Sequence, residues 1–105
     1  MANISITWQN GAPYAPDIVV TGKNAEVITW VPDNTVNVTA ISRPTNASNG
    51  NEFTDPAPVG NSRNWQCRDA CSADGEFPYT ITGSQAPSKK PVSHDPKITN
   101  TRGGI

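Results

Sequence analysis

The sequence has little net charge and no long hydrophobic run. Its 105 residues carry a formal net charge of −1, and the sequence pI is near 5.6. Because a protein without a basic field does not concentrate phosphate backbones at its surface, we exclude nucleic acid as a partner. No apolar run approaches the ~20 residues that a membrane-spanning helix needs, and no signal peptide is visible at the start. The sequence predicts a soluble protein and leaves its compartment open.

Residues that carry most enzyme chemistry are also scarce, since the chain has one His, one Met and two Cys. A nucleophile needs a base and an orienting group, and the only imidazole, His94, would have to meet Cys67 or Cys71 across the fold. The carboxylates available for acid–base pairs are explained more simply as loop and surface charge: Glu52, Asp55, Asp69, Asp74 and Glu76. We therefore predict no enzymatic activity, no catalytic residue and no cofactor.

Turn-forming and β-branched residues are abundant instead. Ten Pro and eight Gly interrupt every long stretch, and the runs between them are rich in Val, Ile, Thr and aromatic residues. Predicted strands cover residues 4–8, 18–20, 27–31, 36–41, 77–82 and 97–100, with Pro78 near the beginning of its strand. This pattern favours an all-β fold: one small antiparallel or Greek-key β-sandwich domain over residues 1–105, immunoglobulin-like or of a related type.

The segments between the predicted strands differ in character. Residues 43–60 form a polar stretch that we interpret as a long surface loop held down by Phe53. Residues 61–74 lack Gly and Pro, and Ser62 is placed to cap a short helical turn there. Residues 84–96 are polar, Pro-rich and mildly basic, which is typical of a loose connection that leads to a last strand at 97–100.

The order of these features resembles that of cupredoxin-like β-sandwiches. The resemblance covers roughly Ile4 to Thr82 and includes the stretch VITWVPDNTVNVTAI, the long loop with Phe53, a Trp-x-Cys segment and the stretch DGEFPYTIT. A type 1 copper centre needs two imidazoles and a thiolate, and His94 is the only histidine. The region where that family places its first histidine ligand reads Asn34-Thr35-Val36-Asn37. The resemblance therefore implies the scaffold without its copper.

The cysteine pair leaves three alternatives open. A turn with the spacing of Cys67 and Cys71 can bring the two residues within reach of a disulfide, although so small a loop would stiffen the turn more than it would stabilise the fold. The residues can equally be two free thiols. They can also bind zinc together with His94 and a carboxylate such as Asp69 or Asp74, while the acidic residues around Gly75 offer oxygen ligands for calcium without the spacing of an EF-hand.

The main hypothesis for function is a non-enzymatic binding or self-assembly module. It would present two loops, residues 43–60 and 67–76, and a last strand at a sheet edge to a protein partner or to itself. The predicted partner-binding residues are Phe53, Trp65, Lys97 and Ile98. A small zinc- or calcium-binding protein that uses Cys67, Cys71 and His94 is one alternative. A carbohydrate-binding module that uses Trp65 is the other, because an aromatic ring outside the regular strands can stack on a sugar.

Overall fold

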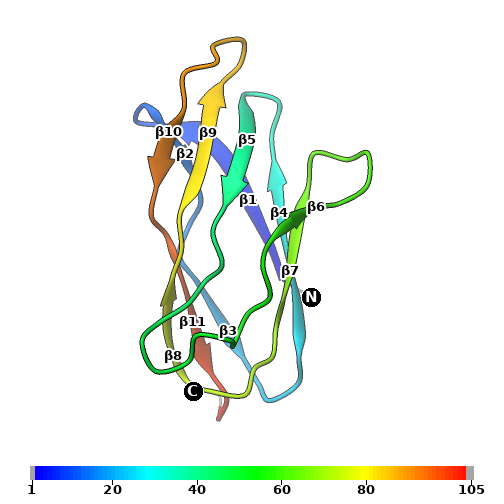
Figure 1. Cartoon of the computed structure of the whole chain (residues 1–105), viewed down its shortest axis with the longest axis vertical. Coiled ribbons are helices and arrows are strands. Elements are labelled where there is room, and N and C mark those ends of the chain that lie inside the picture. Colours follow the sequence, from blue (N-terminus) through cyan, green and yellow to red (C-terminus); the bar gives the residue numbers. More distant parts are fainter. Residues whose placement is uncertain (1, 104–105) are drawn as a thin grey trace.

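Strands make up all the regular secondary structure of the part of the chain that the structure describes, residues 2–103 of a computed structural model. No helix occurs in this part, so the prediction of an all-β fold is confirmed. The strands, shown in Figure 1, are β1 (Ala2–Gln9), β2 (Ala12–Tyr14), β3 (Ile18–Thr21), β4 (Glu26–Pro32), β5 (Val36–Ile41), β6 (Ala57–Pro58), β7 (Trp65–Asp69), β8 (Gly75–Pro78), β9 (Ile81–Gln85), β10 (Val92–His94) and β11 (Lys97–Thr101).

The first layer is a mixed sheet with the strand order β2-β1-β4-β7-β6. The turn Asn10-Gly11 joins β1 to β2, and both residues have positive φ angles, 52° and 77°, in a two-residue hairpin loop. Asparagine and glycine tolerate this left-handed backbone, which is why the pair marks a tight hairpin. Strand β1 also pairs with β4, and that pairing is parallel, so the sheet is not purely antiparallel.

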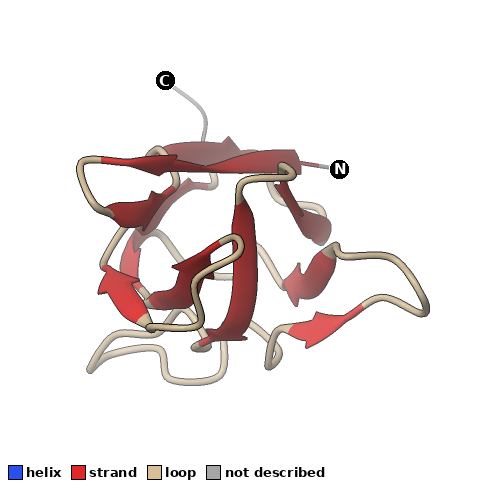
Figure 2. Ribbon diagram, turned by 90° about the horizontal axis from the view of Figure 1, so that it is seen from above, coloured by secondary structure: helices blue, strands red, loops and turns tan. Residues whose placement is uncertain are grey.

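The second layer is built from two smaller sheets, with orders β10-β9-β5 and β3-β11-β8. Strand β8 leads directly into β9, and β10 leads into β11, with two irregular residues at each junction. The amide of Tyr79 donates to the carbonyl of Pro96 at 3.0 Å, which ties the two junctions together. The two sheets therefore continue each other, and Figure 2, seen along the long axis, shows the strands of both layers around one interior.

Three predictions about segments need correction. The region 77–82 is two strands instead of one, and Pro78 ends β8 instead of lying near a strand's beginning. The region 84–96 is more ordered than a loose connection, since it holds the end of β9 and all of β10, which pairs with β9. The region 61–74 has no helical turn. Ser62 lies in a non-helical turn, where its hydroxyl donates to the carbonyl of Val59 at 2.7 Å, and β7 follows.

The last strand forms at the predicted place, as β11, but its position in the sheet differs from the prediction. It lies between β3, to which it is parallel, and β8, to which it is antiparallel. Ile98 points into the core and is 0% exposed. The strand that was expected at an edge is therefore central, because β3 and β8, which come earlier in the sequence, pair with its two sides.

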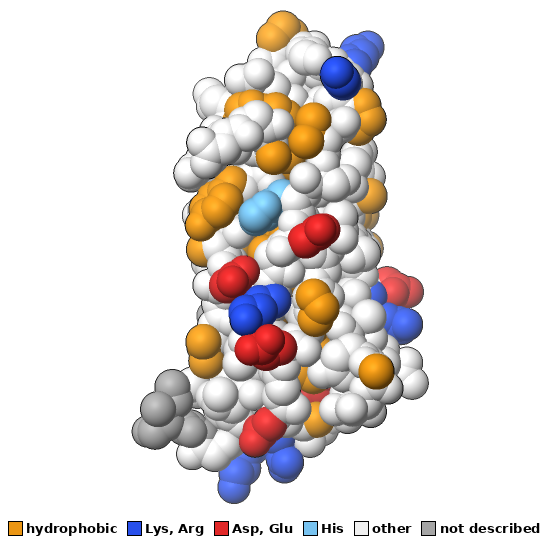
Figure 3. All heavy atoms as spheres, turned by 90° about the vertical axis from the view of Figure 1, so that its left-hand side faces the viewer, with side chains coloured by type: hydrophobic (Ala, Val, Ile, Leu, Met, Phe, Trp, Pro, Cys, Tyr) orange, Lys and Arg blue, Asp and Glu red, His pale blue; other side chains and the backbone are white. Residues whose placement is uncertain are grey.

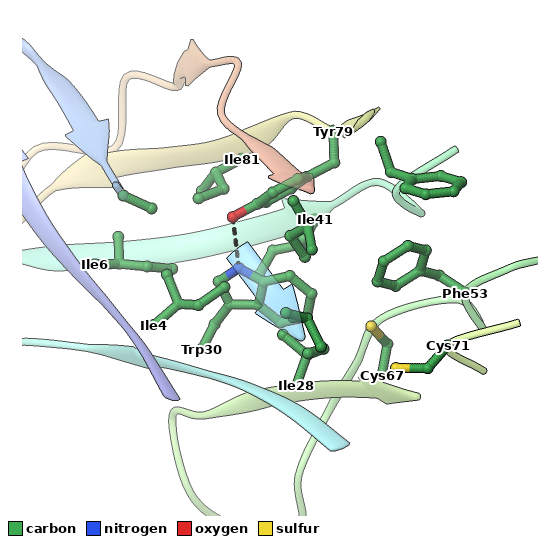
Figure 4. Packing of buried hydrophobic residues seen from close by; sticks show 14 of the residues in the cluster. Ile4, Ile6, Ile28, Trp30, Ile41, Phe53, Cys67, Cys71, Tyr79 and Ile81 are labelled. Carbon is green, nitrogen blue, oxygen red and sulfur yellow. Dashed lines mark hydrogen bonds between the residues drawn. The ribbon is translucent and has the colours of Figure 1, made fainter. Parts of the chain in front are cut away.

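The core consists of inward-facing side chains of both layers, and Figure 4 shows its centre. Trp30 from the first layer meets Tyr79 from the second, with ring centroids 5.4 Å apart and the indole N–H donating to the tyrosine oxygen at 2.9 Å. Phe53 packs edge-on against Phe77 at 5.1 Å, so the prediction that it holds down the long loop is confirmed. Burial of large apolar side chains of this kind is the main source of stability.

The two sides of the sandwich, where the layers meet, are built differently. On one side, which we call the closed side, β2 of the first layer lies beside β9 and β10 of the second. The rings of Tyr14 and His94 lie 5.3 Å apart there, and the His94 ring lies 3.3 Å from the carbonyl oxygen of Ala15. Figure 3 looks onto this side, with the single histidine at the surface. On the other, the open side, the layers end in the edge strands β5 and β6.

Candidate functional site

The open side carries a groove between the two layers, with a volume of about 280 Å³. One wall comes from β5 of the second layer, and the other comes from β6, β7 and the turn between them in the first layer (Figure 1). The lining combines apolar surface with hydrogen-bonding side chains: Pro32, Asn37, Val38, Pro58, Ser62, Arg63 and Trp65. The groove therefore lies where one sheet edge faces another, and we call it the edge groove.

Strand β5 turns part of its backbone toward the edge groove. Because successive residues of a strand direct their amide and carbonyl groups to opposite sides, the contacts of one residue fix the direction for the next. The carbonyl of Thr35 accepts from Ala86, next to β9, so Val36 and Val38 face the other way. Within residues 2–103 no further strand pairs with β5 on that side, which leaves the backbone of Val38 at the rim of the groove.

Arg63 occupies the beginning of this edge. Its guanidinium donates to the carbonyl of Asp33 at 2.7 Å and also to the carbonyl of Val36. Hydrogen bonds from Thr35, with a smaller contribution from the charge of Arg63, hold the pKa of Asp33 below its usual value. Arg63 thus donates hydrogen bonds to two backbone carbonyls that have no neighbouring strand of the described chain as a partner. The part of the β5 edge without such bonds begins at Val38.

Trp65 supplies the aromatic surface of the groove. It opens β7, where it pairs with Trp30 on one side and Pro58 on the other. Its side chain points to the same face of the sheet as Cys67, packs against the core and stays half-exposed. Trp65 is one of the predicted partner-binding residues, and the structure places it in a groove.

The other predicted partner-binding residues lie elsewhere. Phe53 is 2% exposed and Ile98 is 0% exposed, so the structure does not present either side chain at the surface, as the prediction expected. Lys97 is half-exposed on β11, and its ammonium lies 3.2 Å from the carboxylate of Glu76. Phe53 was interpreted as an exposed residue of the long loop and Ile98 as part of an edge strand, whereas both side chains belong to the core.

Cys67 and Cys71 are both free thiols and both buried, so the predicted disulfide is absent. Figure 4 shows them beside Phe53 at the border of the core. Burial, together with the negative charge of Asp69, raises the pKa of Cys67 to about 12 and that of Cys71 to about 11. Both thiols are therefore protonated at neutral pH, and a protonated, buried thiol is a poor nucleophile and a poor metal ligand.

The predicted metal ligands are not brought together. His94 lies on β10 at the closed side, whereas Cys67 lies on β7 in the other layer. Asp74 accepts a hydrogen bond from the amide of Arg102 at 2.7 Å, and Glu76 pairs with Lys97. Within residues 2–103, no group of three or more His, Cys, Asp or Glu side chains is arranged to hold a metal ion. The zinc and calcium sites drawn from Cys67, Cys71, His94 and the acidic residues are therefore not formed.

A buried polar cluster went unpredicted at the end of the molecule where β7, β8 and β11 meet the long loop. The Asn100 amide donates to Asp69 at 2.8 Å and to Glu52 at 3.2 Å. Glu52 also accepts from the amides of Ser72 and Ala73, at 2.8 and 2.9 Å. The alternation within the strands could have revealed the cluster, because Asp69 is in phase with Cys67 and Asn100 is in phase with Ile98, both of which face inward.

The two carboxyl groups of this cluster respond to burial in opposite ways. Burial opposes the ionisation of Glu52, but hydrogen bonds from Ser72, Ala73 and Asn100 outweigh it, and its pKa lies below the usual value. For Asp69 burial dominates over the bonds from Cys71 and Asn100, and the charge of Glu52 adds to it, so its pKa is raised. The cluster ties the long loop to the sheet; it is enclosed and offers no opening for a substrate.

The fold is an all-β sandwich whose layers lie against each other on the closed side and leave the edge groove between them on the open side. No protein-family model matches the chain, and no curated protein sequence matches it either. Among the described residues there is no helix of the length and apolar character that crossing a membrane requires.

Proposed function

We propose that this protein is a non-enzymatic binding module that accepts an extended segment of a partner protein in the edge groove. The segment pairs with the free edge of β5 and lays an apolar side chain against Trp65. Addition of a strand to a sheet edge draws affinity from backbone hydrogen bonds and specificity from the pockets beside them. The observation that carries the proposal is the juxtaposition of the unpaired backbone at Val38 with the half-exposed Trp65 in one groove.

The geometry supports β5 as the edge that is extended. Strand β6, on the opposite wall, has only two residues and ends in Pro58, which has no amide to donate. Arg63 limits the pairing at the other end of β5 because it already holds the carbonyl of Val36. An incoming strand therefore pairs at Val38, beside the β-bulge that shifts the register of β5 between Val38 and Ala40.

The test uses linear peptides, because the natural partner is not identified. A displayed library of random peptides is selected on the full chain, and the best binder is synthesised and titrated by calorimetry. Trp65→Ala should weaken its binding about tenfold or more, since an aromatic anchor at the centre of an interface is worth about 2 kcal/mol. Trp8→Ala, the same change in another half-buried tryptophan outside the groove, is the matched control.

A second variant separates strand pairing from simple contact with the ring. Val38→Pro removes an amide that faces the groove and makes no bond to β9, so it should abolish pairing while thermal unfolding confirms that the fold persists. If selected peptides bind this variant as tightly as the original protein, or if no peptide is selected at all, strand addition at β5 is refuted.

Carbohydrate is the second candidate ligand for the same groove. The polar side chains of Asn37, Ser62 and Arg63 surround Trp65, and sugars are held by such groups around an aromatic face. A sugar that binds here should quench tryptophan fluorescence, and Trp65→Ala should abolish the response. Val38→Pro should leave the sugar response unchanged, because a sugar needs the ring and the polar side chains but no backbone amide from β5.

The scaffold itself is proposed to be cupredoxin-like. The proposal rests on the sequence features of that resemblance, which fall on β4 and β5, the loop anchored by Phe53, the strand β7 that begins at Trp65, and then β8 and β9. A type 1 copper centre needs two imidazoles and the sequence has one histidine, so the proposal carries over the scaffold without electron transfer through such a centre.

A further inference from the structure

Strand β3 differs from the other edge strands because, in the part of the chain that the structure describes, no proline, charged residue or covering segment protects its edge from pairing with another chain. Natural sheets protect their edges with prolines, charges or covering segments. Here β2 contains Pro13, β6 ends in Pro58, β10 lies against β2, and Arg63 caps the beginning of β5. At the outer edge of β8, the side-chain amide of Asn46 donates to the carbonyl of Glu76 at 3.0 Å.

No such device protects β3. The strand Ile18–Thr21 contains neither proline nor a charged residue, and among the strands of the described chain it pairs with β11 alone. Val19 is 55% exposed, more than any other large hydrophobic residue among the exposed ones of the described chain. An unguarded apolar edge of this kind is a template for pairing with another chain.

The direction of the backbone groups on β3 follows from its partner. The amide of Gly22 donates to the carbonyl of Thr101 on β11 at 3.2 Å. Because direction alternates along a strand, Val20 also faces β11, whereas Val19 and Thr21 direct their amide and carbonyl groups to the open edge. The chain then turns away at Gly22, whose φ of +106° suits glycine.

We propose that β3 is a self-association edge, at which a second copy of this chain pairs antiparallel with the first and joins the two second layers into one sheet. The two-fold axis passes beside Val20. Each Val19 exchanges backbone hydrogen bonds with the partner's Thr21, and the two side chains lie on the same, outer face of the sheet. This register uses all the outward-facing groups of β3.

Charge complementarity selects a second copy as the occupant. An acidic residue, Asp17, precedes β3, and a basic residue, Lys23, follows it, and both are exposed. In an antiparallel pair the acidic end of each copy lies beside the basic end of the other, so Asp17 approaches the partner's Lys23 at both ends of the interface. Parallel pairing would bring like charges together, which is destabilising.

The experiment measures mass against protein concentration by sedimentation equilibrium. The mass should rise from 11.2 kDa toward twice that value as the concentration is raised. Lys23→Glu places two acidic groups together at each end and should weaken association about tenfold. Lys90→Glu makes the same change of charge in the exposed segment between β9 and β10, and it should leave association as it is.

A second pair of variants tests the strand edge itself. Val19→Lys puts a charge on the proposed interface and should abolish association, whereas Val31→Lys changes a valine that is 38% exposed on the outer face of the first layer and should have no effect. A mass that stays at 11.2 kDa at millimolar protein, or equal effects within either pair, would overturn the proposal. None of these changes lies in the edge groove, so peptide binding there can fail or succeed independently.

Discussion

The interior of this protein contains two regions that are stabilised in different ways, one by apolar packing and the other by hydrogen bonds between buried polar groups. Around Trp30 the packing is almost wholly apolar, and the single polar atom of the indole is satisfied by Tyr79 at 2.9 Å. Around Asp69 the buried groups are mainly polar, and one oxygen of Asp69 and one of Asn100 have no hydrogen-bond partner. The first region stabilises by burial of area, while the second depends on bonds that must offset the cost of removing charges from water.

This difference teaches where the fold is sensitive and to what. Apolar packing responds to lost volume and is indifferent to pH. A hydrogen-bonded carboxylate responds to protonation and to the loss of a single acceptor, because the donors left behind are buried. Each of the following predictions tests one side of this contrast.

Trp30→Ala should have the largest effect. The side chain is 0% exposed at the centre of the core, and truncation of a buried aromatic residue leaves a cavity that costs about 3–5 kcal/mol. The free energy of unfolding, measured with urea, should fall by that amount. Trp8→Ala, at a half-buried position beside the same core, should cost clearly less. Equal losses would mean that the centre of the core is less tightly packed than the structure indicates.

Glu52→Gln should cost about 2 kcal/mol at neutral pH, since a neutral amide oxygen accepts the bonds from Ser72, Ala73 and Asn100 more weakly than the carboxylate does. Because folding lowers the pKa of Glu52 from 4.5, its stabilisation is complete well above pH 4.5 and is lost as the pH falls through the lower folded value. Unfolding measured between about pH 7 and pH 3 should therefore show a steeper acid loss in the original protein than in Glu52→Gln.

The matched control for that change is Glu76→Gln. The Glu76 carboxylate is exposed and takes part only in a surface ion pair with Lys97, which contributes little in water. Its stability and its acid profile should follow those of the original protein. An equal change in both variants would assign the acid sensitivity to overall charge and not to the buried cluster.

Tyr79→Phe should cost about 1 kcal/mol, because it keeps the packing and removes the acceptor for the indole N–H of Trp30. Tyr14→Phe removes a hydroxyl from a residue that is 37% exposed and should be neutral. The measurement is the unfolding midpoint of each variant, and the midpoint of Tyr79→Phe should be lower than that of Tyr14→Phe. Identical midpoints would show that the one polar bond of the apolar region contributes nothing.

Asp69→Asn should have the smallest effect, less than about 1 kcal/mol at neutral pH. The amide oxygen can accept the bonds from Cys71 and Asn100, and the change removes a buried charge. Folding raises the pKa of Asp69 above 3.8, so its ionised form weakens the fold as the pH rises above that value. A loss as large as that of Glu52→Gln would show that the charge of Asp69 is needed.

The apolar region was predictable from the sequence, and the polar cluster was not. In the predicted strands at 4–8 and 36–41, apolar residues alternate with polar ones at Ile4, Ile6 and Val36, and each of these three is buried. Asp69 and Asn100 occupy inward positions of the same kind, yet an isolated charged or polar residue in a short strand predicts solvent exposure unless its partners are known. Those partners come from 30 or more residues away, so only the folded chain reveals them.

The candidate site was predictable only in part. Trp65 was singled out because it lies in an irregular stretch, and it does line the edge groove. Arg63 and Val38 were missed because their importance depends on β5 being an edge strand. The residue pattern of a single segment does not predict the order of the strands in a sheet. The same ignorance of strand order placed Lys97 and Ile98 at an edge, although β11 lies between β3 and β8.

The central place of β11 also constrains how the protein is made. Strands β3 and β8 are separated by more than half the chain and are not neighbours in their sheet. Each pairs with β11, so this sheet forms only when Lys97–Thr101 is present. While the ribosome is still translating the residues before 97, the unfinished layer exposes Val20 and Phe77, which need that strand as cover. A nascent chain therefore remains open to chaperones and proteases until almost all of these residues have left the exit tunnel.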